Sequence, residues 1–153
     1  MDFIADVRDW LYHISPALLT VVVGGIAIQL LFIQRANAAV FVDGIIKELE
    51  ILKTDALEYW NIDPLEDGEK RCPVLEQKIK GSVISIGNDI SHLCKKFWYR
   101  QAQEQLDELH FALADEATGG LFESADRKVE TLKYLKIVNA ANQLRSRLMM
   151  TKL

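Results

Sequence analysis

The sequence lacks the short motifs by which many enzymes are recognised. It contains no H-E-x-x-H zinc motif, no G-x-S-x-G nucleophile motif, no phosphate-binding glycine loop and no paired C-x-x-C. Two cysteines, Cys72 and Cys94, are too few for a disulfide framework in so small a domain, which favours a reducing compartment. We therefore predict that the protein is not an enzyme and uses no cofactor.

Charge is absent from a long segment near the N-terminus. Residues 16–33, PALLTVVVGGIAIQLLFI, are eighteen consecutive residues without Asp, Glu, Lys or Arg. As a helix this segment would be roughly 27 Å long, close to the ~30 Å hydrocarbon core of a bilayer. The sequence therefore predicts a transmembrane helix over residues 16–34.

A cleaved signal peptide is the alternative to a retained span, because Ala36-Asn37-Ala38 has the A-x-A form of a cleavage site. Signal peptides begin with net positive charge, whereas this chain begins with three acids and Arg8. Arg35 also interrupts the approach to the supposed cleavage site. We therefore expect the span to remain in the mature protein.

Charges beside the span predict its orientation. Few positive residues precede it, while Arg35, Lys47 and Lys53 follow it, and the positive side of a span faces the cytosol. We predict a single-pass protein of the inner cell membrane, with its N-terminus outside and a cytosolic α-helical domain over residues 35–153. Residues 1–15 repeat apolar side chains at helical spacing, which is typical of an amphipathic segment in the membrane interface.

The helix is expected to continue beyond the span, because no breaker occurs before residues 61–68. Its apolar residues advance in steps of 3, 4, 3, 4 and 3. They are Val42, Ile45, Leu49, Leu52, Ala56 and Tyr59. This spacing is typical of the seam of a coiled coil or a helix bundle, and we predict that it sets assembly.

The remaining sequence predicts further helices. A second helix is expected over residues 73–117, with a seam that slips by one residue after Phe97, which indicates a change of twist or a bend. Gly81 and Gly87 would weaken this helix or allow a close helix approach. A last helix over residues 124–150 is expected to direct four apolar residues inward, namely Val129, Leu132, Leu135 and Leu144.

No stretch alternates with period two, so no strand is predicted. The predicted fold class is all-α, with one N-terminal transmembrane helix continuous with a cytosolic helical hairpin or three-helix bundle.

The span carries a stripe of small residues at steps of 3, 4 and 3: Ala17, Thr20, Gly24 and Ala27. Small residues let helices approach closely in lipid, so the stripe predicts a homo-oligomer contact within the membrane. The alternative is a monomeric anchor. Gln29 lies deep in the apolar run, where its amide would form a hydrogen bond between helices or line water.

The charges are unevenly distributed along the chain. Residues 43–69 contain nine acids and two lysines, whereas residues 127–153 contain seven Lys or Arg and one acid, Glu130. The two stretches would attract each other within the fold, or the basic one would meet lipid headgroups, nucleic acid or an acidic partner. The predicted basic partner surface consists of Lys133, Lys136, Arg145 and Arg147.

Neither metal nor nucleic acid is an expected ligand. The Asp89-x-x-His92 and Asp107-x-x-His110 pairs would lie about 27 Å apart on one helix, so we interpret each as a carboxylate–imidazole pair on a solvated face and predict no metal site. Residues 95–100 mix bases with aromatics, as single-strand binders do, but on one helix they would point all around its axis.

In its order of elements, a short span before a helical cytosolic domain, the chain resembles small prokaryotic single-pass membrane proteins associated with antiphage defence. The resemblance implies a protein that acts on the membrane after assembling or being triggered, and it transfers no site residues. We therefore expect a self-associating protein that perturbs or gates the inner membrane. The alternatives are a tethered adaptor whose basic last helix recruits a cytosolic protein, and a nucleic-acid sensor.

Overall fold

The computed structural model describes residues 16–63, 68–97, 99–124 and 129–151. Within these residues the chain forms helices α2 (Pro16–Asn61), α3 (Gly68–Lys96), α4 (Arg100–Thr118) and α5 (Thr131–Met150), and no strand. The all-α prediction is confirmed, whereas the predicted interfacial segment, residues 1–15, lies outside the described residues. The chain divides into two compact units, residues 1–37 and 38–153.

In the first unit, the described residues form the apolar part of α2. The helix is long and apolar enough to cross a membrane, and only 11% of its most apolar window is buried inside the chain. Large side chains such as Val21 and Phe32 are exposed. The core helix of a soluble protein is mostly buried, so this exposure is compatible with a membrane anchor or with a signal sequence near the N-terminus.

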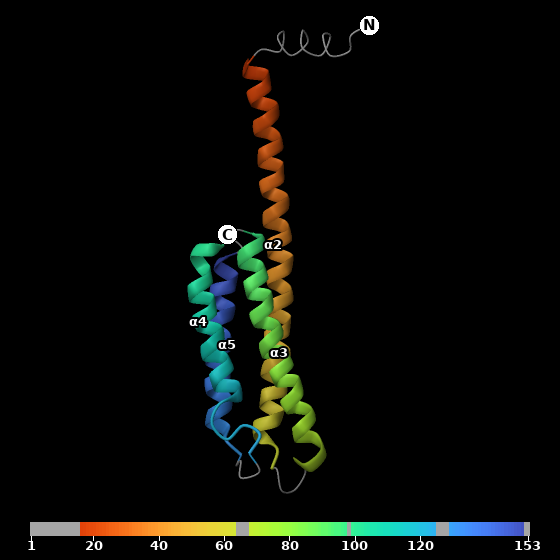
Figure 1. Ribbon diagram of the computed structural model, residues 1–153, viewed down its shortest axis with the longest axis vertical. Coiled ribbons are helices and arrows are strands. Elements are labelled where there is room, and N and C mark those ends of the chain that lie inside the picture. Colours follow the sequence, from red (N-terminus) through yellow and green to blue (C-terminus); the bar gives the residue numbers. More distant parts are fainter. Residues whose placement is uncertain (1–15, 64–67, 98, 125–128, 152–153) are drawn as a thin grey trace. The chain divides into compact units, whose positions relative to one another are not determined.

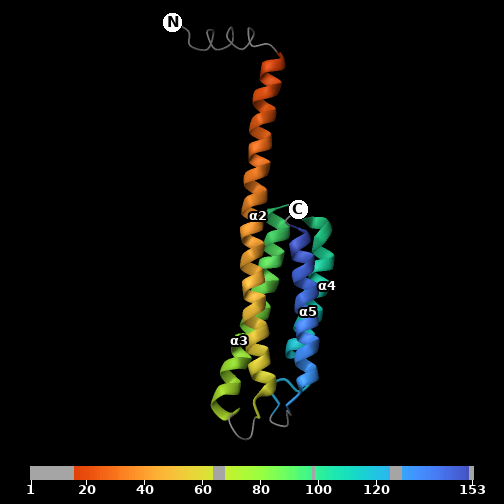
Figure 2. The same cartoon turned by 180° about the vertical axis from the view of Figure 1, so that it is seen from behind.

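The second unit is a bundle of four helices. The part of α2 that begins at Ala38 lies in one bundle with α3, α4 and α5, and successive helices run in opposite directions (Figures 1 and 2). A hydrogen bond from Tyr59 to Glu76 joins α2 to α3, and an ion pair between Arg145 and Glu50 joins α5 to α2. α4 packs between α3 and α5, which completes the ring.

The described residues of the bundle contain four helices, whereas the sequence predicts two for a hairpin or three for a three-helix bundle. The slip after Phe97 is not a change of twist or a bend within one helix, since α3 ends at Lys96 and α4 runs back along it from Arg100. The apolar pattern therefore changes register because a second helix has begun. Helix α3 also begins earlier than predicted, at Gly68 rather than at residue 73.

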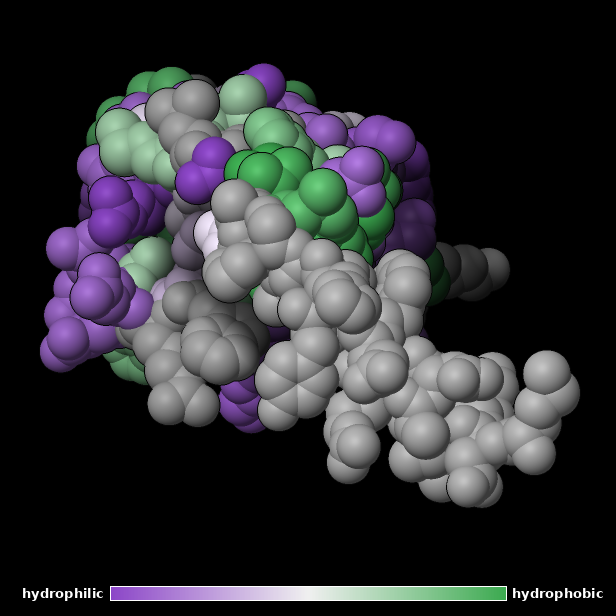
Figure 3. Space-filling view, turned by 90° about the horizontal axis from the view of Figure 1, so that it is seen from above, coloured by the Kyte–Doolittle hydropathy of each residue, from purple (hydrophilic) through white to green (hydrophobic). Residues whose placement is uncertain are grey.

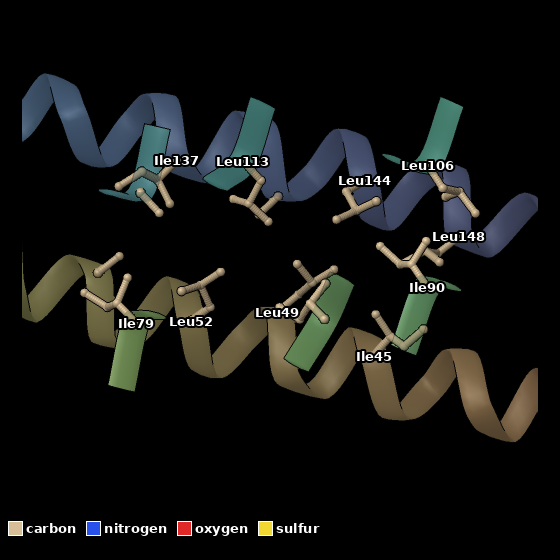
Figure 4. Close-up of a cluster of buried hydrophobic side chains, with 14 of the residues drawn as sticks. Ile45, Leu49, Leu52, Ile79, Ile90, Leu106, Leu113, Ile137, Leu144 and Leu148 are labelled. Atoms are coloured by element: carbon tan, nitrogen blue, oxygen red, sulfur yellow. The ribbon is translucent and has the colours of Figure 1, made fainter. Parts of the chain in front are cut away.

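The predicted seam of α2 forms one wall of the core. All six of its residues are at most 1% exposed, from Val42 to Tyr59. They pack with apolar side chains of the other three helices, whose labelled members point toward one another in Figure 4. These include Ile79 and Ile90 of α3, Leu106 and Leu113 of α4, and Ile137, Leu144 and Leu148 of α5. The core is thus closed within a single chain.

The inward face of the last helix differs from the prediction. α5 begins at Thr131 rather than at residue 124, and Leu132 and Leu135 are 74% and 51% exposed. Val129, before the helix, is also exposed, and only Leu144 of the predicted set is buried. Helix α5 carries leucines on two faces, and the bundle buries the face with Ile137, Ala141, Leu144 and Leu148.

An aromatic cluster joins α2 to the loop after α4. Tyr59, Trp60 and Phe122 are in contact, with ring centroids 4.9–6.5 Å apart. The Tyr59 hydroxyl donates to Glu76 and accepts a hydrogen bond from the backbone N–H of Glu123. The cluster therefore fixes this loop against the bundle.

Gly87 permits a close approach of α3 and α4. A Cβ added there would lie 2.7 Å from Cε1 of His110, whose Nε2 lies 2.8 Å from the Val83 carbonyl oxygen and donates to it. A Cβ added at Gly81 would meet nothing within 4 Å. The two glycines thus have different roles on the same helix.

We predict different effects of alanine at these two glycines. Gly81→Ala should raise the free energy of unfolding by about 0.5–1 kcal/mol, because alanine favours an exposed helix position. Gly87→Ala should displace His110 from Val83, and should therefore be less stable than Gly81→Ala by about 1–3 kcal/mol. Denaturant unfolding of both variants measures the difference, and equal stabilities would contradict the close approach.

Candidate functional site

The small-residue stripe of the span faces open space within the chain. Thr20 and Ala27 are exposed, and a Cβ added at Gly24 would meet nothing within 4 Å. The side chain of Ala17 lies outside the described residues. No side chain of the described chain covers Gly24, so this surface is accessible to lipid or to another helix.

Gln29 is also exposed on the apolar part of α2. Helical spacing places it about 140° around the axis from Gly24, outside the small-residue stripe. Its amide carries two donors and one acceptor oxygen, which hydrocarbon cannot satisfy. If the helix lies in a bilayer, this amide needs a polar partner from outside the span.

The predicted assembly seam lies in the interior of the bundle. Its side chains contact α3, α4 and α5 of the same chain, so a second copy cannot reach them while the bundle is folded. The spacing allowed either a coiled coil or a helix bundle, and the structure places the seam in a bundle. Contacts between copies therefore need another surface.

The predicted basic surface is partly used inside the bundle. Arg145 forms a 3.4 Å ion pair with Glu50, which confirms that the basic and acidic stretches attract each other. Lys133 is mostly buried, 3.5 Å from Glu116 and over the ring of Trp60. Lys136 remains exposed. The four basic residues therefore do not form one free surface.

The two Asp–His pairs lie on different helices, Asp89 and His92 on α3 and Asp107 and His110 on α4, whereas the sequence predicts them on one helix. Because α3 and α4 are separate antiparallel helices, the estimate of 27 Å along one helix does not apply. His110 hydrogen-bonds to the Val83 carbonyl, and the ring of His92 lies against Phe41 at 5.4 Å. No cluster of three metal-ligating side chains occurs among the residues that the structure describes.

Both cysteines are buried in the bundle interior, and neither forms a disulfide. Burial, together with the negative charge of Asp107, raises the pKa of Cys94 above its usual value. A thiol with a raised pKa is seldom ionised near neutral pH, so it is a poor nucleophile and metal ligand. Cys94 is therefore best explained as a small apolar core residue.

Sequence analysis missed an exposed uncharged stripe on α5. Its residues advance in steps of 3, 4, 3, 4 and 3, and all are exposed. They are Leu132, Leu135, Asn139, Asn142, Ser146 and Met149. The apolar spacing rule that found the α2 seam does not find this stripe, because Asn139, Asn142 and Ser146 are polar; the available signal is the absence of charge at this spacing.

No family model matches the chain, and no curated protein or solved structure matches it either.

Proposed function

We propose that this chain is a membrane-anchored helical-bundle protein that self-associates through its span and perturbs or gates the inner membrane. One observation carries the proposal. An apolar helix with an open stripe of small residues is covalently continuous with a bundle whose core is already closed. The resemblance in layout to membrane proteins of antiphage defence agrees with this function.

The closed bundle supports the proposal that self-association occurs through the span rather than through the α2 seam. The α2 seam is covered by the chain itself, whereas the surface around Gly24 is uncovered. In lipid, association depends on close packing and interhelical hydrogen bonds rather than on hydrophobic burial. Gly24 and Ala27 would supply the close packing, and Gln29 would supply a hydrogen bond or line water between helices.

Helix α2 provides a route from the bundle to the membrane. It is one helix over Pro16–Asn61, and no proline or glycine lies between Gly25 and Gly44. A change in packing of the bundle would therefore act on the span through an unbroken backbone. With its N-terminus outside, this arrangement would let a cytosolic event alter the membrane.

Replacing Gly24 with leucine tests the proposal. We expect Gly24→Leu to weaken self-association in mild detergent by about tenfold, or ~1.4 kcal/mol, because a large side chain separates the helices. The substitution meets nothing within 4 Å in the isolated chain, so the monomer should fold normally. Ion leakage from liposomes carrying the chain should fall together with the oligomer.

Gly25→Leu is the matched control, because a Cβ at Gly25 also meets nothing and helical spacing places it away from the stripe. It should leave both oligomer and leakage unchanged. An unchanged oligomer with lost leakage in Gly24→Leu would contradict the assembly role of the stripe. Absence of leakage from the unaltered chain would contradict membrane gating.

A tethered adaptor is the second candidate, and the exposed stripe on α5 favours it. Leu132 and Leu135 lie on the same helix as the exposed Lys136, so the surface fits an acidic amphipathic helix of a cytosolic partner. Leu135→Asp should abolish capture of a specific partner by the chain. Val74→Asp, at a similarly exposed position on α3, should not.

A further inference from the structure

The two ends of the bundle differ in charge. Because the helices alternate in direction, one end of the bundle contains the start of the bundle part of α2, the end of α3, the start of α4 and the end of α5. Figure 3 looks toward this end, and purple hydrophilic groups lie around much of its rim. We call this the Ala38 end and define it by residues 38–42, 93–97, 99–103 and 147–151. These residues include four Lys or Arg and no Asp or Glu.

The opposite end is acidic. Its described residues, 57–63, 68–71, 114–124 and 129–132, contain seven Asp or Glu and two Lys or Arg. The acids are contributed by three helices and by two connecting segments, including Glu58 of α2 and Glu116 of α4. The bundle is therefore electrically polarised along its length.

The helix dipoles explain the positions of Lys95 and Lys96 in the last turn of α3 and of Arg147 in the last turn of α5, but not the rest of this polarity. A helix N-terminus favours an acid, yet α4 begins with Arg100 and has no acid in its first turn. A helix C-terminus favours a base, yet the last turns of α2 and α4 contain none. The charges thus correspond to the end of the bundle on which they lie.

Three bases at the Ala38 end, Lys95, Lys96 and Arg147, form no ion pair with a carboxylate among the described residues. Lys95 and Lys96 are exposed, and Nε of Arg147 has no hydrogen-bond partner. Elsewhere, Lys53, Arg71, Lys80, Lys133 and Arg145 form ion pairs, whereas the exposed Lys47, Lys78 and Lys136 form none among the described residues. Met149 and Met150 add exposed apolar groups beside Arg147. Unpaired bases next to apolar side chains suit an anionic, partly apolar surface.

We propose that the Ala38 end binds the anionic lipid headgroups of the membrane in which the span lies. Only residues 34–37 separate the apolar run from Ala38, so the chain holds this end within a few residues of the bilayer. The inference rests on the proposed membrane residence of the span. Lys95, Lys96 and Arg147 attract the headgroups, while the acidic end is repelled from them.

A fluorophore at the Ala38 end tests this proposal on the full chain. Gln101→Cys provides the attachment site, since Gln101 is exposed and Cys72 and Cys94 are buried. The labelled chain is reconstituted at low density in vesicles of phosphatidylcholine, with or without phosphatidylglycerol, and quenching by headgroup nitroxide lipids is measured. We expect stronger quenching with phosphatidylglycerol, and loss of the difference at high salt.

Charge removal gives the specific control. Lys95→Gln with Lys96→Gln should lower the docking equilibrium constant roughly 25-fold, because each base at an anionic surface contributes a factor of about five. Lys78→Gln with Lys136→Gln removes the same charge from exposed positions outside the Ala38 end and should have little effect. An equal decrease of the docking equilibrium constant in the two double variants would overturn the proposal.

Alkaline extraction separates this proposal from the one on which it rests. If the chain stays in the vesicles and its quenching is the same in both lipid mixtures, headgroup binding is wrong and the anchor stands. If alkali releases the chain, the prediction of a membrane span is wrong, and the headgroup-binding proposal, which depends on that span, is wrong as well.

Discussion

Replacing Leu49 with alanine is expected to lower the free energy of unfolding of the bundle by about 2–5 kcal/mol. Leu49 is 1% exposed in the middle of the α2 seam and packs among apolar side chains of the other helices. Alanine would leave a cavity that a tightly packed bundle can only partly close, so the lost contacts are not replaced. Denaturant unfolding followed by helical circular dichroism measures the change.

The control is Ile51→Ala on the same helix. Ile51 is 55% exposed, so its truncation should change stability by less than about 0.5 kcal/mol. The effect at Leu49 should not depend on protein concentration, because the core belongs to one chain. A loss at Leu49 that grows on dilution would instead place the seam between copies, as the sequence alone allowed.

Spacing was sufficient to predict which face of α2 is buried, but not what covers it. Steps of 3 and 4 identify an apolar face, and the six predicted residues from Val42 to Tyr59 are all buried. The same pattern fits a contact with another chain and a contact within the chain. Only the reversal between α3 and α4 supplies enough helices to cover the seam internally.

That reversal has a weak local signal. No glycine or proline lies between Lys96 and Arg100, and Tyr99, the N-cap of α4, forms no side-chain capping hydrogen bond. Packing of Leu106 and Leu113 into the core therefore determines where the chain turns. The one-residue slip of the apolar pattern after Phe97 is the sequence signal of the reversal, and the same slip also fits a change of twist or a bend within one helix.

Helix α5 shows why the candidate surfaces were only partly predictable. It carries leucines on two faces, and hydrophobicity alone does not say which face the other helices cover. The bundle buries Leu144 and leaves Leu132 and Leu135 exposed. The polarity of the Ala38 end was hidden for a related reason, since its bases belong to three helices that only the topology brings together.

Two aspartates in the span should remove the chain from the membrane. Ile26 and Leu30 lie one turn apart on the apolar part of α2, and both are more than half exposed. Each Asp near the centre of a transmembrane helix costs about 2.5–3.5 kcal/mol, so Ile26→Asp with Leu30→Asp should cost roughly 5–7 kcal/mol of insertion free energy. Flotation and alkaline extraction should recover the unaltered chain with the membrane and the double variant largely in the soluble fraction.

Two aspartates at exposed positions of the bundle provide the control for this loss of membrane insertion. Val74→Asp with Ile84→Asp changes two similarly exposed residues of α3, and the protein should remain with the membrane. Because the bundle core contains neither Ile26 nor Leu30, the soluble double variant should retain the helical content of the bundle. The intact mass of the membrane-bound chain should also include residues 1–37. Recovery of the unaltered, full-length chain in the soluble fraction would contradict the anchor, and a mass that begins after Ala38 would identify a signal peptide instead.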